Sequence, residues 1–245
     1  MSTRSYESVS TPSRVELISF SGSDKTVVNS ARVSLASLEE MEKRNTLTED
    51  LTDRDIKLIK YLATHKHMSP FEHCHITFWV EAPLYISKQH MRHRTWSYNE
   101  VSRRYTSEGL RIYEPRMFRQ QAKRNLQAST NEESDPIVKV ISGEVAQHGT
   151  HASELISDAH RNSVHAYHTL LDAGVCREQA RGVLPNSLMT QYYATVNLRN
   201  LLGFLRERLA DNAQYEIRHL ARQMAECAKS IFPVSYTALM ESDDV

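Results

Sequence analysis

The sequence predicts an α+β fold: a single mixed α/β domain with long helices packed on a small, mainly antiparallel sheet. Apolar and polar side chains alternate over residues 74–81, which is typical of a half-buried strand. Apolar residues recur at helical spacing over residues 136–173, which predicts one long helix closed by a glycine. The chain shows no internal repeat, and its 245 residues are enough to bury a core.

The domain is expected to occupy residues 13–235, between a polar N-terminal tail at 1–12 and a C-terminal tail at 236–245. Residues 107–135 include a polar run and are expected to be irregular and exposed. A capping box at residues 52–55 predicts the start of another helix. The remaining expected elements are strands at 15–20 and 187–196 and helices at 25–35, 83–93, 177–181, 198–207 and 213–232.

The composition limits the classes of function open to the chain. Lys and Arg together number 30, as do Asp and Glu, and this zero net charge argues against a general nucleic-acid binder. No apolar run is long enough to span a bilayer, and the N-terminus lacks the apolar core of a signal peptide. Three widely spaced cysteines without a CxxC pair indicate a reducing compartment. We therefore expect a cytoplasmic protein without nucleic-acid or membrane partners.

The stretch from Arg92 to Tyr105 concentrates positive charge in this neutral chain. Residues 88–105 hold five cations and one anion, with hydroxyl, amide and aromatic side chains between them. Guanidinium groups donate paired hydrogen bonds to phosphate, and the other side chains suit the rest of a nucleotide. The stretch is therefore expected to bind a nucleotide, beginning on the last turn of the 83–93 helix and continuing as a loop. Glycine-rich phosphate motifs are absent, so side chains must do most of the binding.

Six of the twelve histidines lie within residues 65–93, a density that raises the question of a metal site. Zinc sites commonly use a cysteine pair or an HExxH motif, and neither is present nearby. We expect these histidines either to find hydrogen-bond partners in the core or to face a cofactor. No metal ligand is assigned.

The charged stretch resembles the signature of the flavin-dependent thymidylate synthases. It reads RHRTWSYNEVSRRY and fills every fixed position of RHR-x2-S-x-N-E-x-S-x-R-Y. The resemblance covers residues 15–233, nearly the whole chain. Five further segments are similar to the same family in the same order: ARVS at 31–34, HMSPFEH at 67–73, Gln89, EQAR with LP at 178–185, and the block from TVNLR to YEIR at 195–218.

This resemblance implies a fold, an assembly and a reaction. Members of the family are homotetramers of an α/β subunit, and their active sites form where subunits meet. They are methyltransferases that bind FAD, take reducing equivalents from NADPH and carry a methylene group from methylenetetrahydrofolate to C5 of dUMP, which yields dTMP. We expect the same cofactor, co-substrates and substrate here.

The resemblance also assigns site residues by position. Asn212 replaces a histidine that many members have at the flavin, and Gly203 stands where an amide or imidazole is usual. His67 corresponds to a histidine near the flavin and the folate. The residues expected at FAD are Ser34, Ser69, Glu72, Arg92, His93, Arg94, Asn197, Arg199 and Asn212. Those expected at dUMP are Gln89, Arg92, Glu100, Ser102, Arg103, Arg104, Arg181 and Arg208.

Methylation at C5 requires an electron-rich uracil ring, so negative charge on the ring must be stabilised as it develops. Arginine suits this task because it stays protonated. Arg208 is expected at the ring, with Arg104 and Arg181 as candidates for contacts to the phosphate and the ring. Ser102 has no sequence-adjacent base, so we expect it to bind the phosphate instead of acting as a nucleophile. Arg208, Ser102 and His67 are the residues expected to serve the reaction.

Two alternatives come from other classes of protein. An RNA-binding or RNA-modifying protein could use the arginines with Trp96, Tyr98 and Tyr105 for phosphate contacts and base stacking. A non-catalytic assembly protein could retain the same scaffold. An arginine cluster alone is more often a solvated or subunit-bridging patch, and only the full signature with its further segments favours the enzyme.

Overall fold

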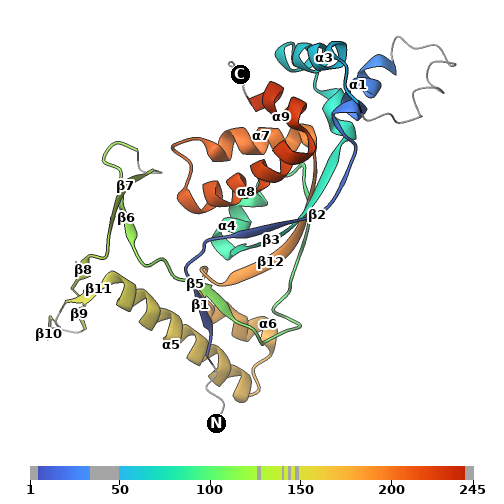
Figure 1. Cartoon of the computed structure of the whole chain (residues 1–245). Coiled ribbons are helices and arrows are strands. Elements are labelled where there is room, and N and C mark those ends of the chain that lie inside the picture. Colours follow the sequence, from blue (N-terminus) through green and yellow to red (C-terminus); the bar gives the residue numbers. More distant parts are fainter. Residues whose placement is uncertain are drawn as a thin grey trace.

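The computed structural model of the chain describes residues 5–33, 50–125, 128–139, 141–142, 145–146 and 149–240. At its centre lies a four-stranded sheet in the order β2-β3-β12-β4, in which all neighbouring strands are antiparallel. Helices lie against this sheet (Figure 1), so the predicted α+β fold is confirmed. The strands are β2 (Arg14–Ser21), β3 (His75–Pro83), β4 (Ser97–Glu100) and β12 (Met189–Asn197).

Buried apolar side chains alternate with more exposed ones along β3 and β12, and the buried ones form much of the main core. Ile76, Phe78 and Val80 of β3 are fully buried. Phe78 and Val80 lie opposite Ala194 and Tyr192 of β12, and opposite residues of antiparallel strands share one face of a sheet. Helices cover this face: α4 (Leu84–His90), α7 (Leu198–Leu209) and α8 (Tyr215–Ile231).

Further helices pack at one end of the sheet, and a buried carboxylate of α3 (Asp53–Thr64) joins two of them, α3 and α1 (Asp24–Arg32). The predicted capping box is confirmed, because the Thr52 hydroxyl accepts from the Asp55 amide at 3.3 Å and Asp55 accepts from the Thr52 amide at 3.0 Å. Asp55 also accepts from Lys25 at 2.8 Å. Burial opposes the charge on Asp55, but its hydrogen bonds outweigh this, and the pKa of Asp55 lies below its ordinary value. The other elements at this end are η2 (Ser69–His73) and α9 (Pro233–Met240).

A second, smaller core lies at the other end of the sheet, where Ile112 and Tyr167 are buried. His160 connects its parts, with Nδ1 2.7 Å from Glu114 Oε1 and Nε2 2.7 Å from Ser187 Oγ. The elements are β1 (Glu7–Val9), its parallel partner β5 (Arg111–Tyr113), and the helical segments α5 (Ala152–Asp172), α6 (Arg177–Ala180) and η3 (Arg181–Val183).

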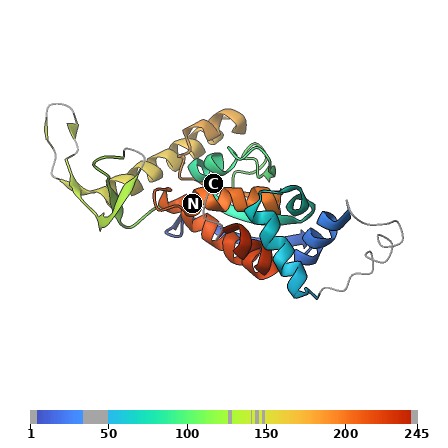
Figure 2. The same cartoon turned by 90° about the horizontal axis from the view of Figure 1, so that it is seen from above.

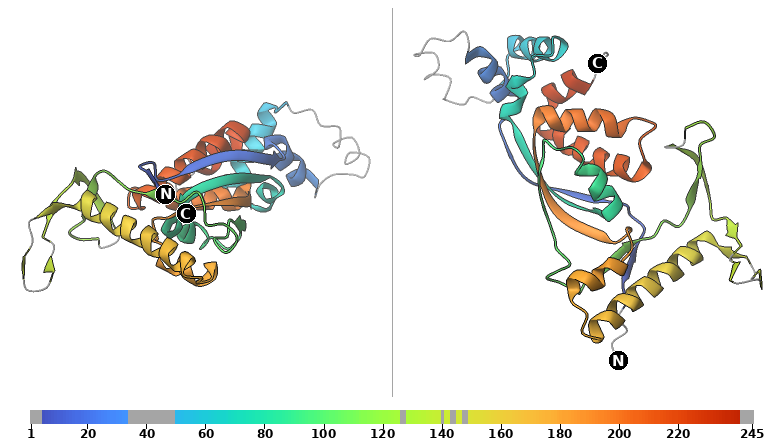
Figure 3. Two further views of the ribbon diagram at one scale, coloured as in Figure 1. Left: turned by 90° about the horizontal axis from the view of Figure 1, so that it is seen from below. Right: turned by 180° about the vertical axis from the view of Figure 1, so that it is seen from behind.

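Two expectations for the middle of the chain are wrong. Residues 107–135 contain the buried β5 and an antiparallel hairpin, and the long helix begins at Ala152 instead of Pro136. Ile137 and Val138 are β-branched, which favours strands, and Ile137 is 68% exposed where the expected helix would bury it. The short strands extend away from the main sheet as an arm (Figures 2 and 3). They are β6 (Phe118–Gln121), β7 (Ser129–Ser134), β8 (Ile137–Val138), β9 (Ile141–Ser142), β10 (Val145–Ala146) and β11 (Thr150–His151).

The signature stretch and the two tails also differ from their expected forms. Helix α4 ends at His90, before the expected His93, and β4 occupies part of the expected loop. The backbone at β4 is extended because it pairs with β12, a partner that local sequence does not reveal. Residues of both expected tails form elements of the fold, since β1 lies within residues 1–12 and α9 continues to Met240.

Among the described residues, no helix combines the length and the apolar character needed to cross a membrane. The same part of the chain contains no group of three or more His, Cys, Asp or Glu side chains that could hold a metal ion.

His90 is fully buried beneath the signature stretch. Its Nδ1 lies 2.9 Å from the Tyr192 hydroxyl, so the side chain is hydrogen-bonded as well as packed. Burial, together with the nearby His93 and Arg208, lowers the pKa of His90 to about 3. Its ring neighbours are Trp96, Tyr98 and Phe204, with centroids 4.6, 5.3 and 4.9 Å away.

A neutral His90 predicts a folded state that loses stability in mild acid. Because the folded pKa lies below the unfolded value of about 6.5, the unfolded chain binds a proton first and stability declines as pH falls below about 6.5. Between pH 6.5 and 5 this residue should remove about 2 kcal/mol from the free energy of unfolding. We expect the free energy of unfolding, measured by urea titration, to depend less steeply on pH in His90→Gln than in the unchanged chain. The difference should correspond to about one bound proton. Equal slopes for the two proteins would contradict a neutral His90.

Candidate active site

The edge strand β4 carries the middle of the signature. Its register with β12 places Glu100 opposite Tyr192, and the amide of Val101 donates to β12 just beyond this pair. The four strand residues span about 10 Å, because an antiparallel strand rises about 3.4 Å per residue. The cations at residues 92–94 and those at residues 103–104 therefore lie at opposite ends of the strand.

The turn after α4 is tied to the core by Tyr98. Its hydroxyl donates to the carbonyl oxygens of His90 at 2.8 Å and His93 at 3.3 Å. Trp96 is buried and lies parallel to Tyr98, with 6.1 Å between the ring centroids. Trp96 and Tyr98 occupy variable positions of the signature, so the motif gave no signal of this anchoring role, and nothing singled out His90 beneath them.

His93 and Arg208 meet at this end of β4. The Arg208 guanidinium donates to His93 Nε2, at 3.2 Å from Nε and 3.1 Å from Nη2. Burial and the charge of Arg208 lower the pKa of His93, although Glu207 at 4.0 Å opposes the shift. A neutral His93 can therefore accept from the guanidinium and orient it while Arg208 keeps its charge. The structure brings together one residue expected at FAD and one expected at dUMP.

The other residues expected at FAD are spread over several elements. Arg92 and Arg94 are exposed, and among the described residues neither side chain has a hydrogen bond or an ion pair. Glu72 and Arg199 form an ion pair, and Asn197 caps α7 by accepting from its Asn200 amide at 3.0 Å. Ser34 lies outside the described residues. The remaining positions are Ser69 at the start of η2, Asn212 in the turn between α7 and α8, and His67, exposed beside the ring of Tyr61.

At the other end of β4, part of the signature lines a cavity of about 450 Å³. Three residues expected at dUMP meet here, namely Glu100, Arg103 and Arg181. Glu100 accepts a hydrogen bond from the Thr190 hydroxyl at 2.8 Å. Lys88 of α4 also lines the cavity, and although the sequence marks it as one of the five clustered cations, no site role was assigned to it.

Two further residues expected at dUMP, Ser102 and Arg104, lie beside these groups. The Ser102 hydroxyl accepts from the Arg104 amide at 3.3 Å. Arg104 Nη2 lies 3.8 Å from a carboxylate oxygen of Glu178, which lines the cavity. Gln89 Oε1 is buried at the end of α4 and has no hydrogen-bond partner in the described part of the chain.

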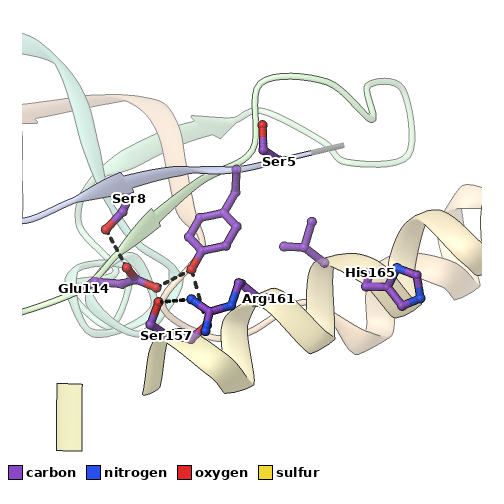
Figure 4. Close-up of a pocket in the computed structure, with 8 residues that line it drawn as sticks. Ser5, Ser8, Glu114, Ser157, Arg161 and His165 are labelled. Carbon is purple, nitrogen blue, oxygen red and sulfur yellow. Dashed lines mark hydrogen bonds between the residues drawn. The ribbon is translucent and has the colours of Figure 1, made fainter. Parts of the chain in front are cut away.

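Another cavity, of about 470 Å³, lies away from the signature between β1 and α5 (Figure 4). The Tyr6 hydroxyl donates to Glu114 at 2.6 Å, and Ser8 and His160 bond the same carboxylate. Burial opposes the charge on Glu114, but these hydrogen bonds outweigh it and lower the pKa of Glu114. This carboxylate therefore ties β1 to α5 and has its hydrogen bonds within the chain.

The sequence of the chain is similar to that of a known enzyme family. The family model described as thymidylate synthase complementing protein matches residues 16–234. A flavin-dependent thymidylate synthase of Thermus thermophilus is 40% identical over 227 residues, which cover 93% of this chain and 75% of that protein. A flavin-dependent thymidylate synthase of Kosmotoga olearia is 36% identical over 226 residues, which cover 92% of this chain and 89% of that protein.

Among solved structures, the chain is similar to the UMP/dUMP methylase PolB of Streptomyces cacaoi. The structure bound with 5-Br dUMP has a TM-score of 0.76 and 34% identity, and the match covers 95% of this chain and 96% of PolB. The structure bound with 5-Br UMP has a TM-score of 0.75 and 32% identity, with 96% of each chain covered. The chain therefore belongs to the flavin-dependent thymidylate synthases, a family of methyl-transferring enzymes that use FAD.

Proposed function

We propose that the chain catalyses the reductive methylation of dUMP at C5, which yields dTMP. In this reaction methylenetetrahydrofolate donates the carbon, and FAD reduced by NADPH supplies the hydride. The observation that carries the proposal is the placement of the family signature: its arginines lie at both ends of β4, and one end lines a cavity large enough for a nucleotide.

The cavity beyond β4 has the chemistry that a nucleoside monophosphate requires. Arg181 lines it and Arg104 lies beside it, so guanidinium groups are available for the phosphate. The Glu100 carboxylate is an acceptor, which suits a ribose hydroxyl better than a phosphate. Ser102, next to Arg104, is proposed to add a hydrogen bond to the phosphate.

The opposite end of β4 has groups that fit FAD. Arg92 and Arg94 are exposed cations without side-chain partners in the described part of the chain, and such groups suit a pyrophosphate. His67, exposed beside Tyr61, is proposed to face the flavin and the folate. The other residues proposed to hold FAD are Ser34, Ser69, Glu72, His93, Asn197, Arg199 and Asn212.

Arg208 is proposed to stabilise the negative charge that develops on the uracil ring. A cation that is already oriented stabilises such charge without reorganising during the reaction. Neutral His93 supplies the orientation, because it accepts from both Nε and Nη2 of Arg208. The buried Gln89 Oε1 lacks a donor among the described residues, and an N–H of the ring would satisfy it.

We infer that a second copy of the chain completes each site. Within one chain, Arg208 lies at the end of α7, whereas Arg181 begins η3 beside α5 and α6 (Figure 1). The two arginines proposed for one small substrate are therefore held by different parts of the fold. A homotetramer with active sites between subunits would bring Arg208 of one copy to the cavity of another.

The aromatic residues of the signature give little support to the RNA-binding alternative. Trp96 is buried and Tyr98 donates its hydrogen bonds inside the protein, so these rings are not open to a base. Of the three rings, Tyr105 alone is well exposed, at 80%. A single exposed ring does not form a stacking platform for successive bases.

Formation of dTMP is the direct test. Protein stripped of flavin is supplied with dUMP, methylenetetrahydrofolate, NADPH and FAD, and FAD is omitted in the control. We expect dTMP only in the complete mixture, and a flavin absorption spectrum that shifts when dUMP is added. UMP serves as a comparison substrate, because PolB was solved with analogues of both nucleotides. A protein that binds no flavin and methylates neither nucleotide would refute the proposal.

Ser102→Ala tests whether this hydroxyl binds or attacks. Among the described residues its partner is the Arg104 amide, and no side-chain base contacts it. We expect the KM for dUMP to rise about ten-fold, as for one lost hydrogen bond to a charged group, while kcat changes much less. Complete loss of turnover with dUMP binding and flavin content intact would instead make Ser102 a nucleophile.

A further inference from the structure

Arg103 occupies a variable position of the signature, yet its side chain is built into the loop that follows β4. Nη1 donates to the carbonyl oxygen of Glu108 at 2.6 Å, and Nη2 donates to that of Gly109 at 3.3 Å. The side chain is half-buried. Both terminal nitrogens of the guanidinium therefore bond the chain itself.

The loop at residues 101–110 is anchored at its two ends by backbone hydrogen bonds. The Val101 amide donates to β12, and the carbonyl oxygen of Leu110 accepts from Glu7 of β1, both at 2.9 Å. Between these anchors, the hydrogen bonds of the described chain are those of Arg103 and two short-range bonds to Ser102. Arg103 is thus the side chain that spans the loop.

Arg103 also lines two cavities, as do Val101 and Met189. On one side is the cavity of about 450 Å³ that contains Arg181. On the other is a cavity of about 370 Å³ lined by Glu108, Gly109 and Arg111. Arg103 therefore contributes to the boundary of the proposed nucleotide site on the side of the second cavity.

We propose that Arg103 is a positioning residue and not a ligand of the dUMP phosphate. Its guanidinium holds loop 101–110 in the shape that places Ser102 and Arg104 for the nucleotide. The inference rests on the proposed function. It changes the role that the family resemblance implies for Arg103, because each terminal nitrogen of the guanidinium already donates to a carbonyl oxygen of the loop, which fixes the side chain against its own backbone.

We call the two hydrogen bonds from Arg103 to the carbonyl oxygens of Glu108 and Gly109 the brace. Two substitutions disturb this brace in different ways. Arg103→Met removes the donors but keeps a long side chain. Gly109→Ala acts on the backbone alone, because Gly109 has a φ of 62° and an added Cβ would meet nothing within 4 Å. Glu108→Gln is the matched control, since only the backbone carbonyl of Glu108 takes part in the brace.

In the nucleotide-free protein, we expect amide hydrogen exchange over residues 102–108 to accelerate about ten-fold in Arg103→Met. Gly109→Ala should accelerate it as well, and Glu108→Gln should not. With dUMP, Arg103→Met should raise KM about ten-fold with a much smaller change in kcat, and Arg103→Lys should recover part of the loss. The double variant with Gly109→Ala should raise KM by less than the product of the single effects, because both act through one loop.

Unchanged hydrogen exchange in Arg103→Met would overturn the inference. So would normal kinetics of Gly109→Ala beside a raised KM of Arg103→Met, because that pattern belongs to a direct phosphate ligand. The exchange comparison needs neither substrate nor turnover. Failure of the brace therefore remains distinct from failure of the proposed function, which would appear as a lack of methylation by the unchanged chain.

Discussion

Antiparallel pairing of β4 with β12 is the constraint on which the candidate site depends. A shift of one residue would exchange the two faces of β4 and remove Glu100 from its place opposite Tyr192. It would also move Tyr98, whose hydroxyl holds the turn at His90 and His93. Strand pairing thus fixes the distance between the arginines at residues 92–94 and those at residues 103–104. Different side chains surround the two ends of the strand.

Those surroundings keep the positive charge of the site fixed over a wide pH range. At one end of β4, burial and Arg208 favour a neutral His93, which orients the guanidinium without adding a second charge. At the other end, Arg103 and Arg181 share a cavity wall with carboxylates. Because arginine does not titrate in this range, the site can hold anionic ligands where a histidine-based site would lose its charge.

Local signals in the sequence predicted the elements that near neighbours determine. The alternation at 74–81 predicted β3, and the capping box at Thr52 predicted the start of α3, because each signal lies within its element. β4 is short, polar and at an edge, so its strand form depends on β12 and could not be read locally. The signature named candidate residues, but which of them meet depends on packing between distant segments, as for His93 with Arg208.

Each active site is proposed to take Arg208 from one copy of the chain and Arg181 from another, and complementation between two variants tests this directly. Arg208→Ala and Arg181→Ala proteins are each expected to be nearly inactive in dTMP formation. When the two are co-expressed in equal amounts, about a quarter of the sites should contain both intact arginines and about a quarter of the activity should return. Activity no higher than that of the separate variants would place both arginines in one chain's site and contradict the shared site.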